Sequence, residues 1–152
     1  MSVDPSAKAP MRMREKVILR IVSKTFIPYI FLFGLYVQFH GDFGPGGGFQ
    51  AGVIFAAGLI LYGVIFGLDT LRTAVPEKVM EIGCALGVLL YGGVGVVCMM
   101  KGGAFLDYDM LDPEHPAHGQ HIGIILIELG VGITVACSMT MIFYALARRG
   151  GN

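Results

Sequence analysis

Charged side chains are scarce in this sequence. Only 14% of the 152 residues are Asp, Glu, Lys or Arg, and 55% are hydrophobic, whereas soluble domains average about 25% charged residues. Eleven basic residues balance eleven acidic ones, so the formal net charge is zero. This composition disfavours an ordinary soluble enzyme, a disordered chain and a nucleic-acid-binding protein, because these classes need many more charges. The chain is instead expected to lie in a lipid bilayer, with no nucleic acid as partner.

Cysteine is also sparse. Cys84, Cys98 and Cys137 are far apart, odd in number and surrounded by apolar residues, and no two of them form a CxxC pair. We therefore expect three small buried hydrophobic side chains, without disulfides or metal ligation. The sequence predicts no catalytic centre, no cofactor and no metal site.

What the chain does contain is four long apolar stretches, at about 18–39, 49–68, 79–100 and 120–146. About 20 apolar residues suffice for a helix to cross a bilayer. The sequence thus predicts an all-α integral membrane protein with four transmembrane helices, forming a single membrane domain over 1–152 after a polar, basic segment at 1–17. Pro28 falls inside the first stretch, where it removes one helix hydrogen bond.

The basic residues indicate the orientation of these helices. Ten of the eleven lie before or at the start of the first stretch, between the second and third, or after the fourth, and Lys101 is the exception. The positive-inside rule places these segments in the cytoplasm. Both termini are then cytoplasmic, the connections 40–48 and 101–119 face outward, and the first stretch is expected to remain as an anchor.

The connection between the first two stretches is unusually rich in glycine. It reads His40-Gly41-Asp42-Phe43-Gly44-Pro45-Gly46-Gly47-Gly48-Phe49 and continues to Gly52. A formal match to the dinucleotide-binding fingerprint fails, because that motif follows a β-strand. The segment is either a flexible turn or a tightly defined turn at membrane depth. In the second case its glycines would contact a neighbouring subunit closely, and the start of the following helix would face a carboxylate or an anion.

These features resemble the MnhB/MrpB family of small subunits of multisubunit Na⁺/H⁺ (Mrp-type) antiporters. The resemblance rests on a basic, proline-containing first span, on Gly34-Leu35-Tyr36, and on the motif formed by Pro45, Gly46, Gly47, Gly48, Phe49 and Gly52. It implies a multi-pass subunit of a bacterial or archaeal cell membrane complex, with other membrane subunits as partners. It also implies Na⁺ efflux coupled to H⁺ uptake, so the chain would be a transporter subunit and not an enzyme.

Glu128 lies about a third of the way into the fourth stretch. A carboxylate at this depth costs roughly 2.5–3.5 kcal/mol on insertion scales. Glu128 is therefore a candidate for an ion or proton path, or alternatively a neutral group that holds a partner helix by hydrogen bonding. His121 lies seven residues earlier, on the same helix face and about 10 Å away along the axis, and is the second candidate. Below Glu128 that face carries no ionisable side chain, so a complete path would need groups from other subunits.

The connection 101–119 is acidic and holds several histidines. Three histidines spaced three residues apart make a metal site conceivable, but a solvated acidic loop that attracts cations mildly and responds to pH is the simpler interpretation. The residues concerned are Asp107, Asp109, Asp112, Glu114, His115, His118 and His121.

Three other functions compete with the antiporter interpretation. The first is an equivalent subunit of a redox-driven complex such as a membrane-bound hydrogenase. The second is a stand-alone small exporter that exchanges cations for protons, and the third is a purely structural spacer subunit.

Overall fold

The computed structural model describes residues 17–41 and 44–149, and throughout this part of the chain the regular structure is helical. The elements are α1 (Val17–His40), α2 (Gly48–Phe66), α3 (Leu68–Ala74), α4 (Glu77–Met100), the 3-10 helix η2 (Tyr108–Leu111) and α5 (Pro116–Arg149). Helices α1, α2, α4 and α5 are long and apolar enough to cross a membrane. The prediction of an all-α chain with four transmembrane helices is therefore confirmed. The expected segment 1–17 lies outside the described residues, apart from Val17.

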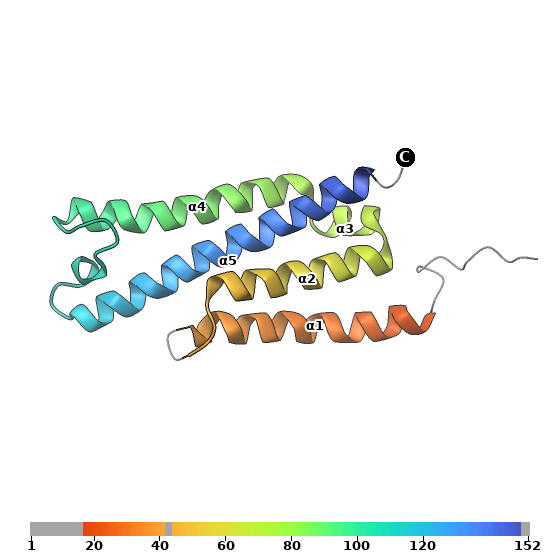
Figure 1. The fold of residues 1–152 in the computed structure, drawn as a ribbon, viewed down its shortest axis with the longest axis horizontal. Helices are drawn as coiled ribbons and strands as arrows, with labels where there is room; N and C mark the ends of the chain where they lie inside the picture. The colour runs from red at the N-terminus through yellow and green to blue at the C-terminus, as the bar shows by residue number, and fades with distance from the viewer. Residues whose placement is uncertain (1–16, 42–43, 150–152) are drawn as a thin grey trace, which may run out of the picture.

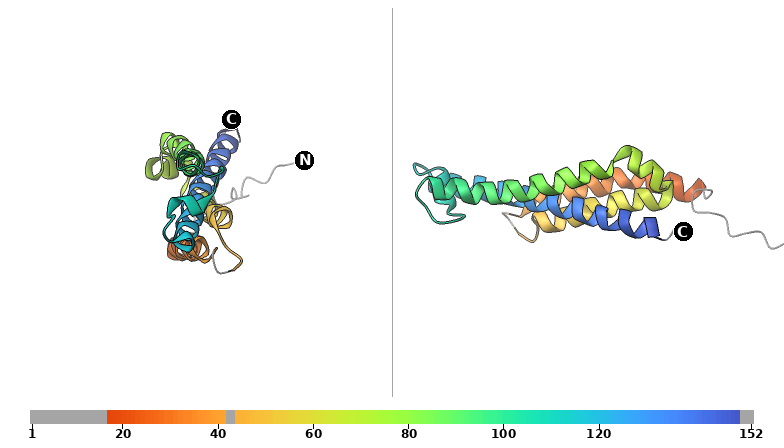
Figure 2. Two further views of the ribbon diagram at one scale, coloured as in Figure 1. Left: turned by 90° about the vertical axis from the view of Figure 1, so that its left-hand side faces the viewer. Right: turned by 90° about the horizontal axis from the view of Figure 1, so that it is seen from above.

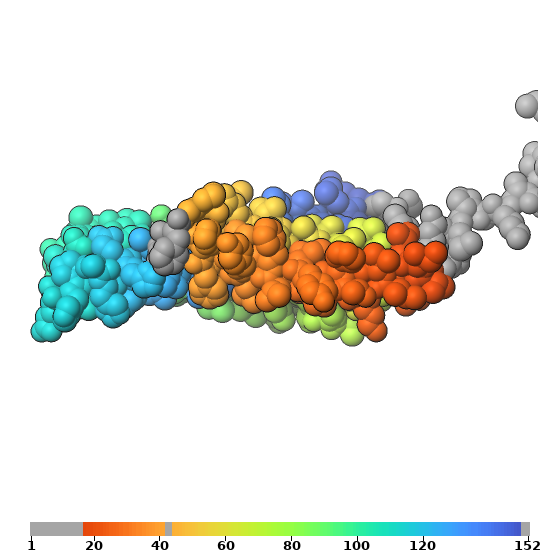
Figure 3. All heavy atoms as spheres, turned by 90° about the horizontal axis from the view of Figure 1, so that it is seen from below, coloured from red at the N-terminus to blue at the C-terminus, as the bar shows by residue number. Residues whose placement is uncertain are grey.

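The four long helices lie side by side in the order α1, α2, α5, α4 (Figures 1 and 2). The extensive helix contacts join α1 to α2, α2 to α5 and α5 to α4. A row of this kind leaves both broad faces open, so large apolar side chains such as Phe33 and Leu89 are mostly exposed. Figure 3 looks at the α1 edge, where this helix is uncovered over its length. Such a surface suits lipid or further membrane helices and is far too apolar for water.

The helices do not end at the same level. α5 has 34 residues and is about 51 Å long, whereas the 19 residues of α2 reach only about 28 Å. α1 and α2 therefore meet α5 over the part nearer its carboxyl end, and the α1–α2 connection lies beside α5 well short of its start (Figure 1). α1 begins and α5 ends at the same end of the row.

Gly67 separates α2 from α3. Its φ of 101° lies in the left-handed region that glycine adopts without strain, and the chain turns there into α3. Leu71 of α3 is fully buried. The end of this turn is held by Tyr144 of α5, whose hydroxyl donates a 2.6 Å hydrogen bond to the Val75 carbonyl.

Two arginines hold the start of α4. Glu77 forms ion pairs with Arg148 of α5 and with Arg72 of α3. Together with the Tyr144 bond, these contacts fasten α3, α4 and α5 to one another at the end of the row where α5 stops.

The opposite end of the row is formed by η2 and its flanking turns. Lys101 Nζ donates a 2.8 Å hydrogen bond to the Leu111 carbonyl, and Gln120 Nε2 donates one of 2.8 Å to Asp109 Oδ1. The His118 ring lies 2.9 Å from Asp112, and this contact holds the pKa of the Asp112 carboxyl below its usual value. The connection is thus folded back onto the start of α5.

Candidate functional site around Glu128

The Glu128 side chain lies against the glycine-rich connection between α1 and α2. A Cβ atom at Gly41 would overlap the Glu128 carboxylate, and one at Gly47 would lie 2.9 Å from Glu128 Oε1. The Glu128 side chain is half-buried. Two segments separated by about eighty residues in sequence therefore meet at a single carboxylate.

The backbones of α2 and α5 approach closely at the same place. A Cβ atom at Gly48 would overlap the Glu128 carbonyl oxygen, and one at Gly52 would lie 2.6 Å from the Gly132 carbonyl oxygen and 2.8 Å from Val135 Cβ. No side chain larger than hydrogen fits there unless the helices move apart. The first turns of α2 are consequently in backbone contact with α5.

The connection itself has a defined course. Gly47 adopts a φ of 110°, which is strained for any residue with a Cβ atom, and its N–H donates a 3.0 Å hydrogen bond to the Val37 carbonyl. The segment is therefore a tightly defined turn and not a flexible one. The neighbour that its glycines contact is α5 of the same chain, where the sequence had suggested another subunit. Asp42 and Phe43 lie outside the described residues.

The position of Glu128 matters electrostatically because α2 begins beside it. The first N–H groups of a helix have no partner within the helix, and the helix dipole places partial positive charge there. The residue before α2 is Gly47, which has no side chain with which to cap the helix. A carboxylate at this point is therefore stabilised by the helix start, which offsets part of the cost of placing negative charge in a membrane.

The other predicted residues lie around this contact. His121 is exposed on α5, seven residues before Glu128. Pro45 is exposed in the connection, and a Cβ atom at Gly46 would lie 2.8 Å from the Val37 carbonyl oxygen. Phe49 is 61% exposed. The described residues contain no group of three or more metal-ligating side chains.

Sequence reasoning missed Gln38, which is buried on α1. Its Oε1 atom lies 2.7 Å from the Cβ position of Gly132, one turn below Glu128 on α5. A lone amide in an apolar span was the available signal. Further along α5, Val135 is packed against Gly52 of α2.

Replacement of Gly48 by alanine tests the close contact. Gly48→Ala should lower stability by about 1–3 kcal/mol, because the new methyl group forces α2 away from α5. Gly92→Ala is the matched control, since nothing lies within 4 Å of the added Cβ atom and alanine favours helix over glycine by up to about 1 kcal/mol. Thermal unfolding of both variants in detergent provides the measurement. Equal unfolding temperatures for the two variants would contradict the contact.

Comparison of the sequence with known proteins identifies the family. Residues 18–141 match a family described as a domain related to the MnhB subunit of Na⁺/H⁺ antiporter. An antiporter subunit mnhB2 of Staphylococcus haemolyticus (strain JCSC1435) is 32% identical over 136 residues, which cover 86% of this chain and 94% of that protein. The protein of the same name from Staphylococcus aureus (strain Newman) is 31% identical over 133 residues, with the same coverage. The chain therefore belongs to the MnhB family of Na⁺/H⁺ antiporter subunits, which are multi-pass cell membrane proteins of a transporter and not enzymes.

Proposed function

We propose that Glu128 carries exchanged ions within the antiporter, taking up and releasing a proton or a sodium ion in turn. The observation that supports this role is the position of its carboxylate, held on a membrane helix against the glycine connection and the start of α2. A carboxylate can alternate between a protonated and a cation-paired state, which is the chemistry that antiport requires. The net exchange would be Na⁺ efflux coupled to H⁺ uptake.

In this proposal His121 is the group through which protons reach Glu128 from the outer side of the membrane. It is exposed near the start of α5, and it lies on the same helix face as Glu128, about 10 Å away. Imidazole exchanges protons near neutral pH, and water could bridge the remaining distance. The acidic connection around η2 would raise the local concentration of cations at this end.

The path beyond Glu128 requires other subunits. On the same face of α5, Gly132 and Val135 are packed under α2, and neither can carry a proton. The path would therefore leave this chain near Glu128 and Gln38 and continue through groups of a neighbouring subunit. This dependence argues against a stand-alone exporter, and the family relationship favours an antiporter subunit over a component of a redox-driven complex.

Replacement of Glu128 by glutamine in the intact complex tests the role. Glu128→Gln should leave assembly unchanged, because the amide keeps the size of the side chain, and should reduce antiport by about tenfold or more, because an amide cannot exchange a proton. Na⁺-driven proton movement in inverted vesicles gives the activity, and native gel electrophoresis gives the assembly. Asp69→Asn in α3, an exposed carboxylate outside the acidic connection, is the control and should have normal activity. Normal antiport in a normally assembled Glu128→Gln complex would contradict the ion-carrying role of Glu128. A purely structural spacer role would then remain for the subunit.

The orientation is a second proposal, supported by the ten basic residues at one side. Cysteine placed by Glu114→Cys should react with a membrane-impermeant thiol reagent added to intact cells, whereas Asp69→Cys in α3 should react only after the cells are opened. Both positions are exposed, so burial does not distinguish them. The unmodified chain supplies the background from its three cysteines, which lie in membrane helices. The reverse labelling pattern would place both termini outside.

A further inference from the structure

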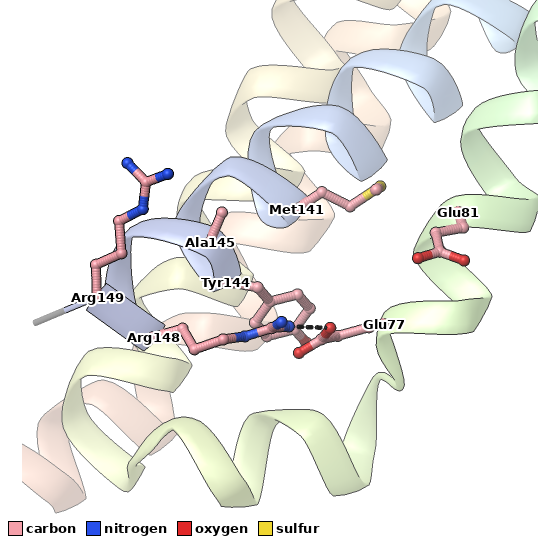
Figure 4. Close-up of a pocket in the computed structure, with 7 residues that line it drawn as sticks. All are labelled: Glu77, Glu81, Met141, Tyr144, Ala145, Arg148 and Arg149. Atoms are coloured by element: carbon pink, nitrogen blue, oxygen red, sulfur yellow. Dashed lines mark hydrogen bonds and ion pairs between the residues drawn. The ribbon is translucent and has the colours of Figure 1, made fainter. Parts of the chain in front are cut away.

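A groove follows the seam between α4 and α5 from the end where α5 stops. It opens as a pocket of about 410 Å³ lined by Glu77, Glu81, Met141, Tyr144 and Arg148, among others (Figure 4). Glu81 and Met141 also line a second hollow with Ala85 and Val88, and Val88 is shared with a third that reaches Tyr91 and Gly130. From Glu81 to Tyr91 the groove extends about 15 Å along α4. Beyond Glu81 its lining is predominantly apolar.

The mouth of this groove holds charges of both signs. Glu77 is already paired with Arg72 and Arg148. Glu81, one turn further into α4, has no ion pair or hydrogen bond within the described residues, and its carboxylate points into the space between the two helices (Figure 4). The Arg148 side chain is 63% exposed and uses one of its nitrogens for Glu77, so other guanidinium N–H groups remain accessible. An unpaired anion and an accessible cation therefore face one pocket.

From this arrangement we infer that the α4–α5 groove binds one molecule of a zwitterionic aminophospholipid. The ammonium group of the lipid would pair with Glu81, its phosphate would accept hydrogen bonds from Arg148, and one acyl chain would lie along Ala85 and Val88. An ammonium group offers three N–H donors, and a guanidinium matches phosphate geometry. The hollows of the groove are open to the outside of the chain, so lipid can enter from the side. This site is separate from Glu128 and does not depend on its role.

The two charges select among the possible occupants. An anionic headgroup without an amine would be repelled by Glu81, and a lysine or arginine from a neighbouring helix would be repelled by Arg148 and Arg149. A quaternary choline headgroup has the same net charge as the aminophospholipid but cannot donate a hydrogen bond to Glu81. Preference for the primary amine over choline is therefore the distinctive property of the proposed site.

Photo-crosslinking with lipids tests this site in the intact complex. Phosphatidylethanolamine, phosphatidylcholine and phosphatidylglycerol with the same diazirine-bearing acyl chain are incorporated separately, and adducts on peptides of α4 and α5 are quantified by mass spectrometry. The ethanolamine lipid should give about tenfold more adducts than the choline lipid, since hydrogen bonds to charged groups contribute about this factor. Glu81→Gln should remove the preference, whereas Glu114→Gln should keep it.

A groove-filling variant separates headgroup recognition from simple contact with lipid. Ala85 is exposed, so Ala85→Trp should leave the fold intact while reducing adducts from all three lipids. Equal yields from the three headgroups, or an unchanged preference in Glu81→Gln, would overturn the proposal. Disulfide crosslinking from Ala85→Cys to a cysteine on another subunit's helix, with no lipid adduct on α4 or α5, would show that a protein helix occupies the groove instead.

Discussion

The backbone contact between the start of α2 and α5 is the constraint on which the rest of the structure depends. Because Gly48 and Gly52 carry no side chain, α2 can begin directly against α5, beside Glu128 and Gly132. This contact fixes the level at which α1 and α2 meet α5. The first turns of α5 then remain free of α2 and pack against η2. It also brings the glycine connection onto the Glu128 carboxylate. A larger residue at Gly48 would separate all of these features together.

The energetics explain why Glu128 stands out. Insertion scales assign roughly 2.5–3.5 kcal/mol to a charged residue at the centre of a membrane helix. A nearby helix start returns typically 0.3–1 kcal/mol, and about 2 kcal/mol in favourable geometries. The α2 start therefore offsets only part of the cost. An apolar residue would pack at lower cost, which is consistent with a role for this carboxylate beyond holding two helices together.

The sequence predicted the four helices and singled out Glu128, because hydropathy and a charge within an apolar run are both local signals. It did not predict which segment the glycines contact, since close packing depends on how far each helix extends along its neighbours. The Tyr144 bond to Val75 and the burial of Gln38 were missed for the same reason, as each joins segments far apart in sequence. The order of the helices in the row also depends on such distant contacts. The sequence also did not predict the short α3 helix. This helix begins after Gly67, a glycine in the left-handed region that lies inside the apolar stretch 49–68.

If Glu128 carries the exchanged ions, its carboxyl group alternates between protonation and sodium binding. The most direct measurement is modification of the intact complex by a hydrophobic carbodiimide, which reacts with protonated carboxyl groups, followed by mass spectrometry of the α5 peptide that contains Glu128. We expect an adduct at Glu128 that becomes more abundant as the pH falls and less abundant when Na⁺ is added at constant ionic strength. A Glu128 that is never modified, or whose modification depends on neither pH nor Na⁺, would rule out this alternation.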